Sequence, residues 1–339
     1  MSTKNNISIL AGDIGGTNAR LALLALVDGR LAFVREQTFA SREEPSLESV
    51  LRKFLVDTQH PISKACMGVA GPVRQGRCEA TNLPWIIDAA VLAKQLKLVE
   101  VGLINDLEAQ AYGTPELEAE ALEVLNAGSV DPLGNCAVIA AGTGLGEVGL
   151  FRHGDELRPF ASEGGHADFA PRNHLEISLL EYILKHHSRV STERVVSGRG
   201  LVNIYHFLKE TGLAEEPAWL AEQMRSGEPP AVVSGNALEA RSPLCEQALD
   251  LFVTLYGAEA GNLALKLMAT GGIYLGGGIA PKIIAKLREP LFMNAFTAKG
   301  RMKPLMQTMP VRVILNPKTA LLGAARYALR PKEVLIDGT

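Results

Sequence analysis

The stretch Gly12-Asp13-Ile14-Gly15-Gly16-Thr17-Asn18-Ala19-Arg20 lies near the start of a 339-residue chain. Apolar residues on either side predict two strands, Ile7 to Gly12 and Thr17 to Leu26. A strand that enters a glycine turn and leaves as a second strand is neither a Walker loop nor a Rossmann fingerprint, because a helix follows the glycines in both of those motifs. Glycine lets backbone N–H groups approach phosphate oxygens closely. The stretch therefore predicts a phosphate-binding turn, with an ordinary glycine hairpin as the alternative.

Two side chains of this turn extend the prediction. Thr17 offers a hydroxyl donor to a phosphate group. Asp13 stands at the end of its strand, where a carboxylate can hold a hydrated Mg²⁺ ion. We therefore expect a phosphate group and Mg²⁺ as ligands, with Asp13 as the metal residue. The candidates for contact with the phosphate compound are Gly12, Asp13, Ile14, Gly15, Gly16 and Thr17.

The segments that follow this turn predict a fold. Strands are expected at Leu31 to Phe39, Ala65 to Ala70 and Val99 to Ile104, and helices at Ser46 to Thr58 and Asp88 to Leu96. The resulting order, β-β-β-α-β-α-β followed by a helix, resembles the ribonuclease-H-like fold of actin-type ATPases and sugar kinases. We therefore expect an α/β protein in which two ribonuclease-H-like domains with mixed sheets flank an ATP/sugar cleft.

The rest of the chain predicts the second domain. Its expected strands are Cys136 to Ala141, Glu147 to Phe151, Ile273 to Leu275 and Val311 to Leu315. Its expected helices are Asn173 to His187, Gly200 to Thr211 and Ser242 to Met268. A closing helix, Thr319 to Leu329, is expected to return to the first domain. The predicted division is a smaller α/β domain of residues 1–114 plus 317–339 and a larger one of residues 115–316 with helical insertions.

The composition and charge of the chain argue against several classes of protein. The chain is 47% hydrophobic and 21% charged with a net charge of −3, and it has no basic stripe of the kind that nucleic-acid binders carry. No apolar run reaches the roughly 18 residues that cross a bilayer. The four cysteines form no CxxC pair, so a zinc or disulfide framework is not expected, and Cys66 and Cys136 read as reduced core residues. We expect a cytoplasmic protein with no nucleic-acid or membrane partner.

Two further glycine runs add to the phosphate-binding prediction. Ala141-Gly142-Thr143-Gly144-Leu145-Gly146 joins two predicted strands, as the first turn does. Gly276-Gly277-Gly278 precedes a helix expected to start near Ala280, and a helix N-terminus favours anions. Each run alone is also compatible with a structural turn. These two runs add Gly142, Thr143, Gly144, Gly277 and Gly278 to the candidate phosphate-binding residues.

Asn105-Asp106 ends a predicted strand and opens a helix. A carboxylate there is placed to accept the proton of a substrate hydroxyl. The alternative is that Asp106 only caps its helix. Beside two phosphate-binding turns, the catalytic interpretation of Asp106 is the stronger one.

Several other polar residues are candidates for binding sugar hydroxyls. Glu163-Gly164-Gly165-His166 places a carboxylate and an imidazole three residues apart, and hydroxyls donate to the first and accept from the second. Asn82 lies in the segment Thr81-Asn82-Leu83-Pro84-Trp85, which is expected to be a loop. Glu193, in Ser191-Thr192-Glu193-Arg194, could equally be a structural residue at a helix start.

Taken together, these residues resemble bacterial glucokinases of the hexokinase-like superfamily, over nearly the whole chain. The segments that carry the resemblance are Gly12 to Arg20, Thr81 to Trp85, Ile104 to Asp106, Ala141 to Gly146, Glu163 to Ala170, Ser191 to Gly200, Gly261 to Leu265 and Gly276 to Pro281. The resemblance implies transfer of the ATP γ-phosphoryl group to the 6-hydroxyl of glucose by a homodimer at the entry to glycolysis.

The resemblance also implies roles for single residues. Asp106 would be the catalytic base and, with Asn82, Asn105, Glu163, His166 and Glu193, would bind glucose. The related repressor/open-reading-frame/kinase proteins carry a cysteine-rich zinc motif after the segment that corresponds to Glu163 to His166. Here Ala167-Asp168-Phe169-Ala170-Pro171 follows instead, which favours the zinc-free glucokinase branch.

Two other function classes are compatible with such a fold. A sugar-sensing transcriptional regulator would need an added DNA-binding segment, and the phosphate-binding strand already begins at residue 7. An actin-like or chaperone-like ATPase would not need a hydroxyl-binding set such as Glu163, His166 and Glu193. Both are therefore weaker hypotheses than a sugar kinase.

Overall fold

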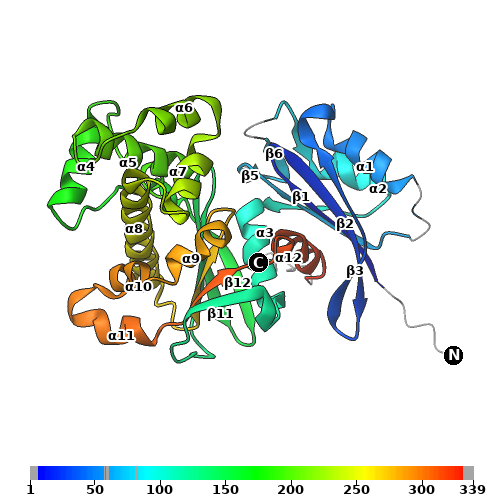
Figure 1. Cartoon of the computed structure of the whole chain (residues 1–339). Coiled ribbons are helices and arrows are strands. Elements are labelled where there is room, and N and C mark those ends of the chain that lie inside the picture. Colours follow the sequence, from blue (N-terminus) through cyan, green and yellow to red (C-terminus); the bar gives the residue numbers. More distant parts are fainter. Residues whose placement is uncertain (1–6, 57, 59–60, 81–82, 331–339) are drawn as a thin grey trace. The chain divides into compact units, whose positions relative to one another are not determined.

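The structure, a computed structural model, describes residues 7–56, 58, 61–80 and 83–330. The chain forms two compact units (Figure 1). Unit 1 comprises Met1–Glu118 and Asn316–Thr339, and unit 2 comprises Ala119–Leu315. Each unit has its own mixed β-sheet and its own helices, which confirms the predicted α/β class.

The sheet of unit 1 has five strands in the order β3-β2-β1-β4-β8. The antiparallel part is β1 (Ser8–Ile14), β2 (Asn18–Val27) and β3 (Arg30–Ala40). β4 (Lys64–Val69) and β8 (Gly102–Asn105) run parallel to β1. The carboxyl ends of three neighbouring strands, β1, β4 and β8, therefore meet at one edge of this sheet.

Helices cover both faces of this sheet. Because alternate residues of a strand point to opposite faces, neighbouring residues of β1 pack against different helices. Leu10 of β1 belongs to the hydrophobic cluster that contains residues of α1 (Leu47–Leu55) and α2 (Ala89–Leu96). Its neighbours Ile9 and Ala11 belong to the cluster with α3 (Asp106–Gly113) and α12 (Thr319–Ala328). The two helices α3 and α12 lie side by side in Figure 1.

Unit 1 also has short elements that the sequence analysis did not predict. A three-stranded sheet is formed by β5 (Val73–Arg74), β6 (Arg77–Glu79) and β7 (Ile86–Asp88). Two 3₁₀ turns, η1 (Ser41–Glu43) and η2 (Thr114–Glu116), follow β3 and α3. Strands of two or three residues are too short to show a clear hydrophobic period.

Unit 2 repeats the plan of unit 1 on a six-stranded sheet, in the order β12-β11-β10-β13-β14-β9. β10 (Cys136–Ala141), β11 (Leu145–His153) and β12 (Glu156–Ala161) are antiparallel. β13 (Gly272–Gly276) and β14 (Val311–Ile314) run parallel to β10. The edge strands β12 and β9 (Leu122–Asn126) were not predicted.

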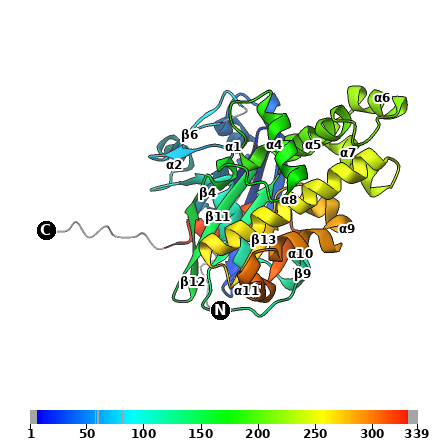
Figure 2. The same ribbon diagram turned by 90° about the vertical axis from the view of Figure 1, so that its left-hand side faces the viewer.

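The long helix α8 (Pro243–Leu267) crosses the strands of unit 2 (Figure 2). Ser242 caps its first turn, accepting a hydrogen bond from the Cys245 N–H at 3.4 Å, and Pro243 is its first residue. The buried Tyr256 hydroxyl donates to the Ile139 carbonyl of β10 at 3.1 Å, which ties α8 to the sheet.

The other helices of unit 2 surround α8. Two of them, α4 (His174–Leu184) and α5 (Gly198–Glu210), agree with the predicted helices within a few residues. The remaining helical elements are α6 (Ala218–Ser226), α7 (Pro229–Leu238), α9 (Ile284–Leu287), α10 (Pro290–Thr297) and α11 (Lys303–Thr308), with 3₁₀ turns η3 (Ala119–Ala121), η4 (Gly164–His166), η5 (Thr192–Arg194), η6 (Ala280–Ile283) and η7 (Gly300–Met302).

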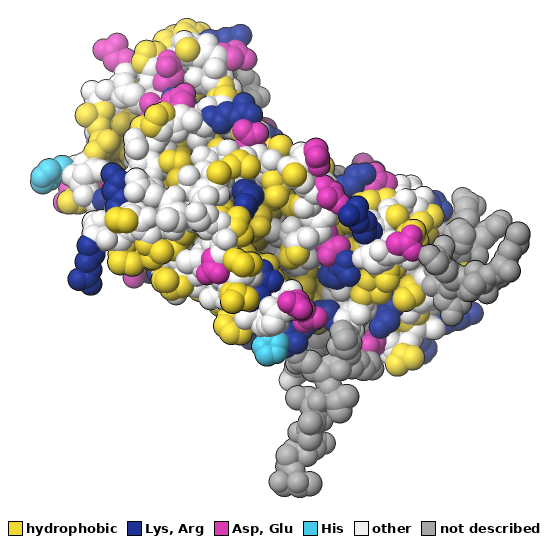
Figure 3. Space-filling view, turned by 90° about the horizontal axis from the view of Figure 1, so that it is seen from below, with side chains coloured by type: hydrophobic (Ala, Val, Ile, Leu, Met, Phe, Trp, Pro, Cys, Tyr) yellow, Lys and Arg dark blue, Asp and Glu magenta, His cyan; other side chains and the backbone are white. Residues whose placement is uncertain are grey.

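All four cysteines are buried and carry free thiols, with Cys66 in β4 and Cys136 in β10. Within the described residues, no helix is both long and apolar enough to cross a membrane. Among the side chains coloured by type in Figure 3, Lys and Arg are scattered between Asp and Glu on the face shown.

Candidate active site

The predicted metal residue and the predicted base lie at the same edge of the unit 1 sheet. Asp13 of β1 pairs with Gly68 of β4, and the following residue of β4, Val69, pairs with Asn105 of β8. Gly68 allows a close approach here, because a Cβ atom on it would lie 2.7 Å from Ala109 Cβ of α3. Asp106, the first residue of α3, follows Asn105 directly. Asp13 and Asp106 interact electrostatically, and the charge of Asp106 contributes to raising the pKa of Asp13.

Backbone and serine hydrogen bonds hold the first glycine turn. The Gly15 N–H donates to the Asn18 carbonyl at 2.9 Å. Ser41, buried at the end of β3, donates from Oγ to the Gly15 carbonyl at 2.8 Å and from its N–H to the Thr17 carbonyl at 2.9 Å. Sequence reasoning missed Ser41, because the two contacts span more than twenty residues and depend on the β2–β3 pairing.

The glycine at position 12 also has a packing role. A Cβ atom on Gly12 would lie 2.4 Å from the Met67 sulfur of β4. Thr17, in contrast, is exposed. The turn can therefore offer its backbone and the Thr17 hydroxyl to a phosphate group, while Gly12 lets β1 and its neighbours pack.

Asn105, and not Asp106, is the N-cap of α3. Its Oδ1 accepts a hydrogen bond from the Leu107 N–H at 2.9 Å, and its Nδ2 donates to the Gly71 carbonyl at 3.2 Å. Asp106 is the first helical residue, and its Oδ1 also accepts from the Leu107 N–H at 2.9 Å. The alternative that Asp106 caps the helix is therefore wrong. Burial raises the pKa of Asp106, and the hydrogen bond from Leu107 opposes the shift.

The environment of Asp13 fits a bound cation. Burial raises the pKa of Asp13 to about 6, Arg20 lowers it and Asp106 raises it. The Arg20 guanidinium lies 3.8 Å from the carboxylate, so it compensates the two acidic groups only partly. No group of three or more His, Cys, Asp or Glu side chains in the described parts of the chain could hold a metal ion. Mg²⁺ needs only one or two protein carboxylates when phosphate and water supply its other ligands.

The second and third glycine runs lie next to each other in unit 2. The Gly142 N–H donates to the Gly144 carbonyl at 2.8 Å, and the Gly142 carbonyl accepts from the Gly198 N–H at 2.8 Å. Gly277 has φ +76°, and a Cβ atom there would lie 2.3 Å from the Ala141 carbonyl oxygen. Open space of at least 4 Å surrounds the missing Cβ positions of Gly142 and Gly278. Thr143 is exposed.

The prediction of an α-helix that starts near Ala280 is wrong. Residues 280–283 form the 3₁₀ turn η6, and the α-helix that follows, α9, has only four residues. Pro281 supplies no N–H donor within this turn. Any role of Gly277 and Gly278 in binding phosphate therefore depends on the glycine backbone and not on a helix dipole.

Glu193 joins the predicted sugar residues to the second glycine turn. Its Oε2 accepts a hydrogen bond from the Leu145 N–H at 2.9 Å. A Cβ atom on Gly144 would lie 2.4 Å from the same oxygen. The carboxylate of Glu193 can therefore reach the turn only because residue 144 is glycine.

The turn that contains Glu163 and His166 packs on the same strand, β11. Residues 164–166 form η4, closed by a hydrogen bond from the His166 N–H to the Glu163 carbonyl at 2.9 Å. A Cβ atom on Gly165 would lie 2.0 Å from the Leu145 carbonyl oxygen. The side chains of Glu163 and His166 are exposed. The structure thus brings Glu163, His166 and Glu193 together around Leu145.

Asn82 lies outside the described residues. In the same segment, Trp85 is buried, and its Nε1 donates to the Glu44 carbonyl at 3.1 Å. The Trp85 side chain is therefore part of the core of unit 1.

One cavity of unit 1 lies away from these residues. It measures about 810 Å³, and Lys64, Val99 and Tyr327 are among the residues that line it. None of the predicted site residues appears among its described lining. We therefore base the candidate site on the strand ends and turns described above.

Comparison with known proteins identifies the family. The Glucokinase family model matches residues 10–331. The curated glucokinase of Nostoc punctiforme is 43% identical over 337 residues, which covers 95% of this chain and 99% of that protein. The glucokinase of Synechocystis sp. is 45% identical, covering 94% of this chain and 97% of that protein. This chain belongs to the glucokinase family.

The fold agrees with that of a solved member of the glucokinase family. The crystal structure of glucokinase from an Antarctic psychrotroph superposes with a TM-score of 0.84 at 32% identity, covering 95% of this chain and 98% of that one. The resemblance to bacterial glucokinases predicted from the sequence is confirmed. As a glucokinase family member, the chain is an ATP-dependent hexose kinase.

Proposed function

We propose that this protein transfers the γ-phosphoryl group of ATP to the 6-hydroxyl of glucose, giving glucose 6-phosphate and ADP. The observation that carries the proposal is the contact of Glu193 with Leu145 and Gly144. This contact joins a carboxylate able to bind a sugar to a glycine turn able to bind phosphate. Membership of the glucokinase family supports the same substrates.

Each unit has polar groups that are candidates for binding the sugar. In unit 2, Glu163 and Glu193 accept hydrogen bonds from glucose hydroxyls, and His166 can donate or accept one. In unit 1, the Asn105 amide and the Asp106 carboxylate bind further hydroxyls, and Asn82 is a further candidate. Because a bound hydroxyl replaces water on each group, an analogue that lacks the hydroxyl leaves a protein group unpaired.

Asp106 is the base of the reaction. The 6-hydroxyl of glucose is a very weak acid, so the carboxylate first orients it and accepts its proton late, as the bond to phosphorus forms. Asn105 is the N-cap of α3, and the carboxylate of Asp106 shares the Leu107 N–H with it. A carboxylate at the first residue of a helix is held rigidly and near the positive end of the helix dipole.

The glycine turns bind ATP. Residues 12–17 in unit 1, and residues 142–144 and 277–278 in unit 2, contact phosphate oxygens. The Gly15 and Gly142 N–H groups already bond within their own turns, so the donors are other N–H groups of these turns and the hydroxyls of Thr17 and Thr143. Asp13 holds Mg²⁺, through water or directly. When bound, the ion neutralises charge on the phosphate oxygens.

Three properties stay predictions: a cytoplasmic location, a homodimeric state and a role at the entry to glycolysis. The homodimer is the simplest to test, by light scattering of the purified protein. We expect a mass of about twice the 36.3 kDa of one chain.

A coupled assay of ADP release across a panel of hexoses tests the proposed function. We expect ATP consumption that depends on sugar, with glucose among the substrates, and glucose 6-phosphate as the product. ATP consumption that does not respond to any hexose would indicate an ATPase. Binding of glucose without turnover would indicate a sugar sensor.

A further inference from the structure

A buried acidic side chain lies directly beneath the turn that carries Glu163 and His166. Glu147, in the middle of β11, is only 2% exposed. A Cβ atom on Gly164 would lie 2.1 Å from Glu147 Oε2 and 2.9 Å from its Cδ. The carboxyl group of Glu147 therefore fills the space under the first residue of η4.

The contacts of this turn with β11 involve two neighbouring glycines. Gly164 packs on the side chain of Glu147, and Gly165 packs on the carbonyl of Leu145, two residues earlier in the same strand. The Gly164 N–H donates to Ser162 Oγ at 2.9 Å. The position of the turn, and with it of Glu163 and His166, thus depends directly on the volume and charge of residue 147.

One carboxyl oxygen of Glu147 has no hydrogen-bond partner among the described residues. This oxygen, Oε1, is buried. The charged and titratable groups that face it come from α8, namely Tyr256, Glu259 and Lys266. The pKa of Glu147 is raised to about 7, mainly by burial and also by Glu259, while Lys266 opposes the shift. Glu163 and His166 are the titratable groups of the turn itself, and both are exposed.

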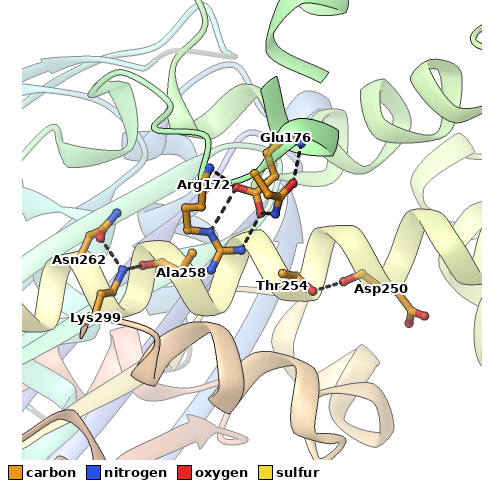
Figure 4. A network of polar contacts seen from close by, with 8 residues as sticks. Arg172, Glu176, Asp250, Thr254, Ala258, Asn262 and Lys299 are labelled. Carbon is orange, nitrogen blue, oxygen red and sulfur yellow. Dashed lines mark hydrogen bonds and ion pairs between the residues drawn. The ribbon is translucent and has the colours of Figure 1, made fainter. Parts of the chain in front are cut away.

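Glu259 belongs to a polar network along α8. The same helix contains the segment Gly261 to Leu265, to which the proposed function gives no role. Asn262 Nδ2 donates to Glu259 Oε2 at 2.9 Å, and Lys299 Nζ donates to Asn262 Oδ1 at 2.6 Å. Figure 4 shows Lys299 between Asn262 and Ala258. The network fixes Glu259, so its charge acts on Glu147 from a defined position.

We infer that Glu147 is a positioning residue for glucose binding, which holds the Glu163–His166 turn in its binding geometry when its carboxyl group is neutral and loosens it when the group ionises. The inference rests on the proposed function. Ionisation creates a buried negative charge with no hydrogen-bond partner on Oε1 and with Glu259 nearby, and opening of the turn lets water reach that charge.

The direction of the pH effect follows from this account. Glucose binds most tightly to the form with neutral Glu147, so the KM for glucose rises with pH above about 7. If only that form binds well, the rise amounts to about tenfold between pH 6 and pH 8, which is the upper limit for one ionisation. The KM for ATP does not follow this curve.

Two variants isolate the effect of the charge. Glu147→Gln keeps the volume and cannot ionise, so its KM for glucose should stay low and nearly constant between pH 6 and pH 8. Glu259→Gln removes the neighbouring charge that raises the pKa of Glu147, so its rise in KM should begin at a lower pH than in the parent. A merely structural role of Glu147 predicts neither change.

Glu176→Gln is the matched control. Glu176 is a fully buried carboxylate of the same unit, and it binds Arg172 at 2.6 Å and not the turn (Figure 4). Its replacement is expected to lower stability and to leave the pH dependence of the KM for glucose as in the parent.

Hydrogen exchange of the backbone amides of residues 163–167, measured without sugar, keeps the test independent of activity. At pH 8 the parent should exchange these amides faster than Glu147→Gln, and at pH 6 the two should be equal. Equal exchange at both pH values, or the same rise in KM in Glu147→Gln as in the parent, would overturn the inference. A parent that shows the exchange difference but phosphorylates no glucose would contradict only the proposed function.

Discussion

In each unit a glycine turn joins two antiparallel strands of equivalent position, but the side chains that hold the two turns differ. In unit 1, the turn between β1 and β2 is fixed by the neutral hydroxyl of Ser41, and Asp13 stands beside it. In unit 2, the turn between β10 and β11 is fixed by the carboxylate of Glu193, which accepts from the Leu145 N–H. The same strand plan therefore supports two tasks. In the function we propose, the acids of unit 1 serve metal and proton chemistry, and those of unit 2 orient the sugar.

This difference predicts that changes in unit 1 reduce turnover and that changes in unit 2 weaken glucose binding. The largest effect is expected for Asp106→Asn. Asparagine can still hold the sugar hydroxyl but cannot accept its proton, so kcat should fall by about 10²–10⁴. Steady-state kinetics should show a KM for glucose within several-fold of the parent.

Asp88→Asn is the matched control for that variant. Asp88 also stands at a helix start in unit 1, where its Oδ1 accepts from the Ala90 N–H at 2.9 Å. Asparagine caps a helix about as well as aspartate, so parental turnover is expected. An Asp106→Asn enzyme with more than about a tenth of parental kcat would remove Asp106 from catalysis, because a tenfold loss is only about 1.4 kcal/mol of barrier.

In unit 2, Gly144→Ala should weaken the use of glucose through Glu193, beside any effect on the KM for ATP from its place in the phosphate-binding turn. The added Cβ would lie 2.4 Å from Glu193 Oε2 and displace the carboxylate. A displaced partner costs roughly 1–3 kcal/mol, so kcat/KM for glucose should fall about 5- to 150-fold. Gly235→Ala in α7, where nothing lies within 4 Å of the added atom, should have no effect on kinetics. Equal kinetics of the two variants would separate Glu193 from the glucose site.

His166→Ala tests a single sugar contact in the same unit. Loss of one hydrogen-bonding partner should lower kcat/KM for glucose within the same range of about 5- to 150-fold, with the loss mainly in KM. Because His166 is exposed, its replacement should leave the melting temperature unchanged. An unchanged kcat/KM for glucose would exclude His166 from the site.

The smallest expected effect is a change with pH in the Mg²⁺ requirement, which depends on Asp13. Because burial raises the pKa of Asp13 to about 6, its carboxyl group is mostly protonated at pH 5 and mostly ionised at pH 7. A metal binds the ionised form, so the Mg²⁺ concentration that gives half-maximal activity should rise about tenfold from pH 7 to pH 5. Asp13→Asn should need more Mg²⁺ at both pH values and lose this dependence. An identical Mg²⁺ requirement of the parent at both pH values would argue against Asp13 as a metal residue.

Sequence reasoning reached the fold class and most long elements, because strands such as β1 and helices such as α8 carry a clear hydrophobic period. It missed the edge strands β9 and β12, which are only partly buried and therefore lack that signal. It expected a helix near Ala280 where the chain forms a 3₁₀ turn.

At the candidate site, the sequence indicated residues whose type suggests chemistry, such as Asp13, Asp106 and Glu193. It could not indicate residues that act through tertiary contacts. Ser41 holds a turn more than twenty residues away, and Glu147 reads as one charged residue in an apolar strand. Only the packing of Gly164 on its carboxyl group points to its proposed role in supporting the Glu163–His166 turn. How the six predicted sugar residues share the hydroxyls of glucose stays a prediction.

Glucose labelled with ¹⁸O at the 6-hydroxyl gives the most direct test of the proposed reaction. If that hydroxyl attacks the γ-phosphorus of ATP, its oxygen becomes the bridging oxygen of the phosphate ester. Mass spectrometry of the product should then show glucose 6-phosphate that retains the label, formed in equal amount to ADP. Release of inorganic phosphate with unmodified labelled glucose, or a sugar phosphate that carries its phosphate on another hydroxyl, would contradict the assignment.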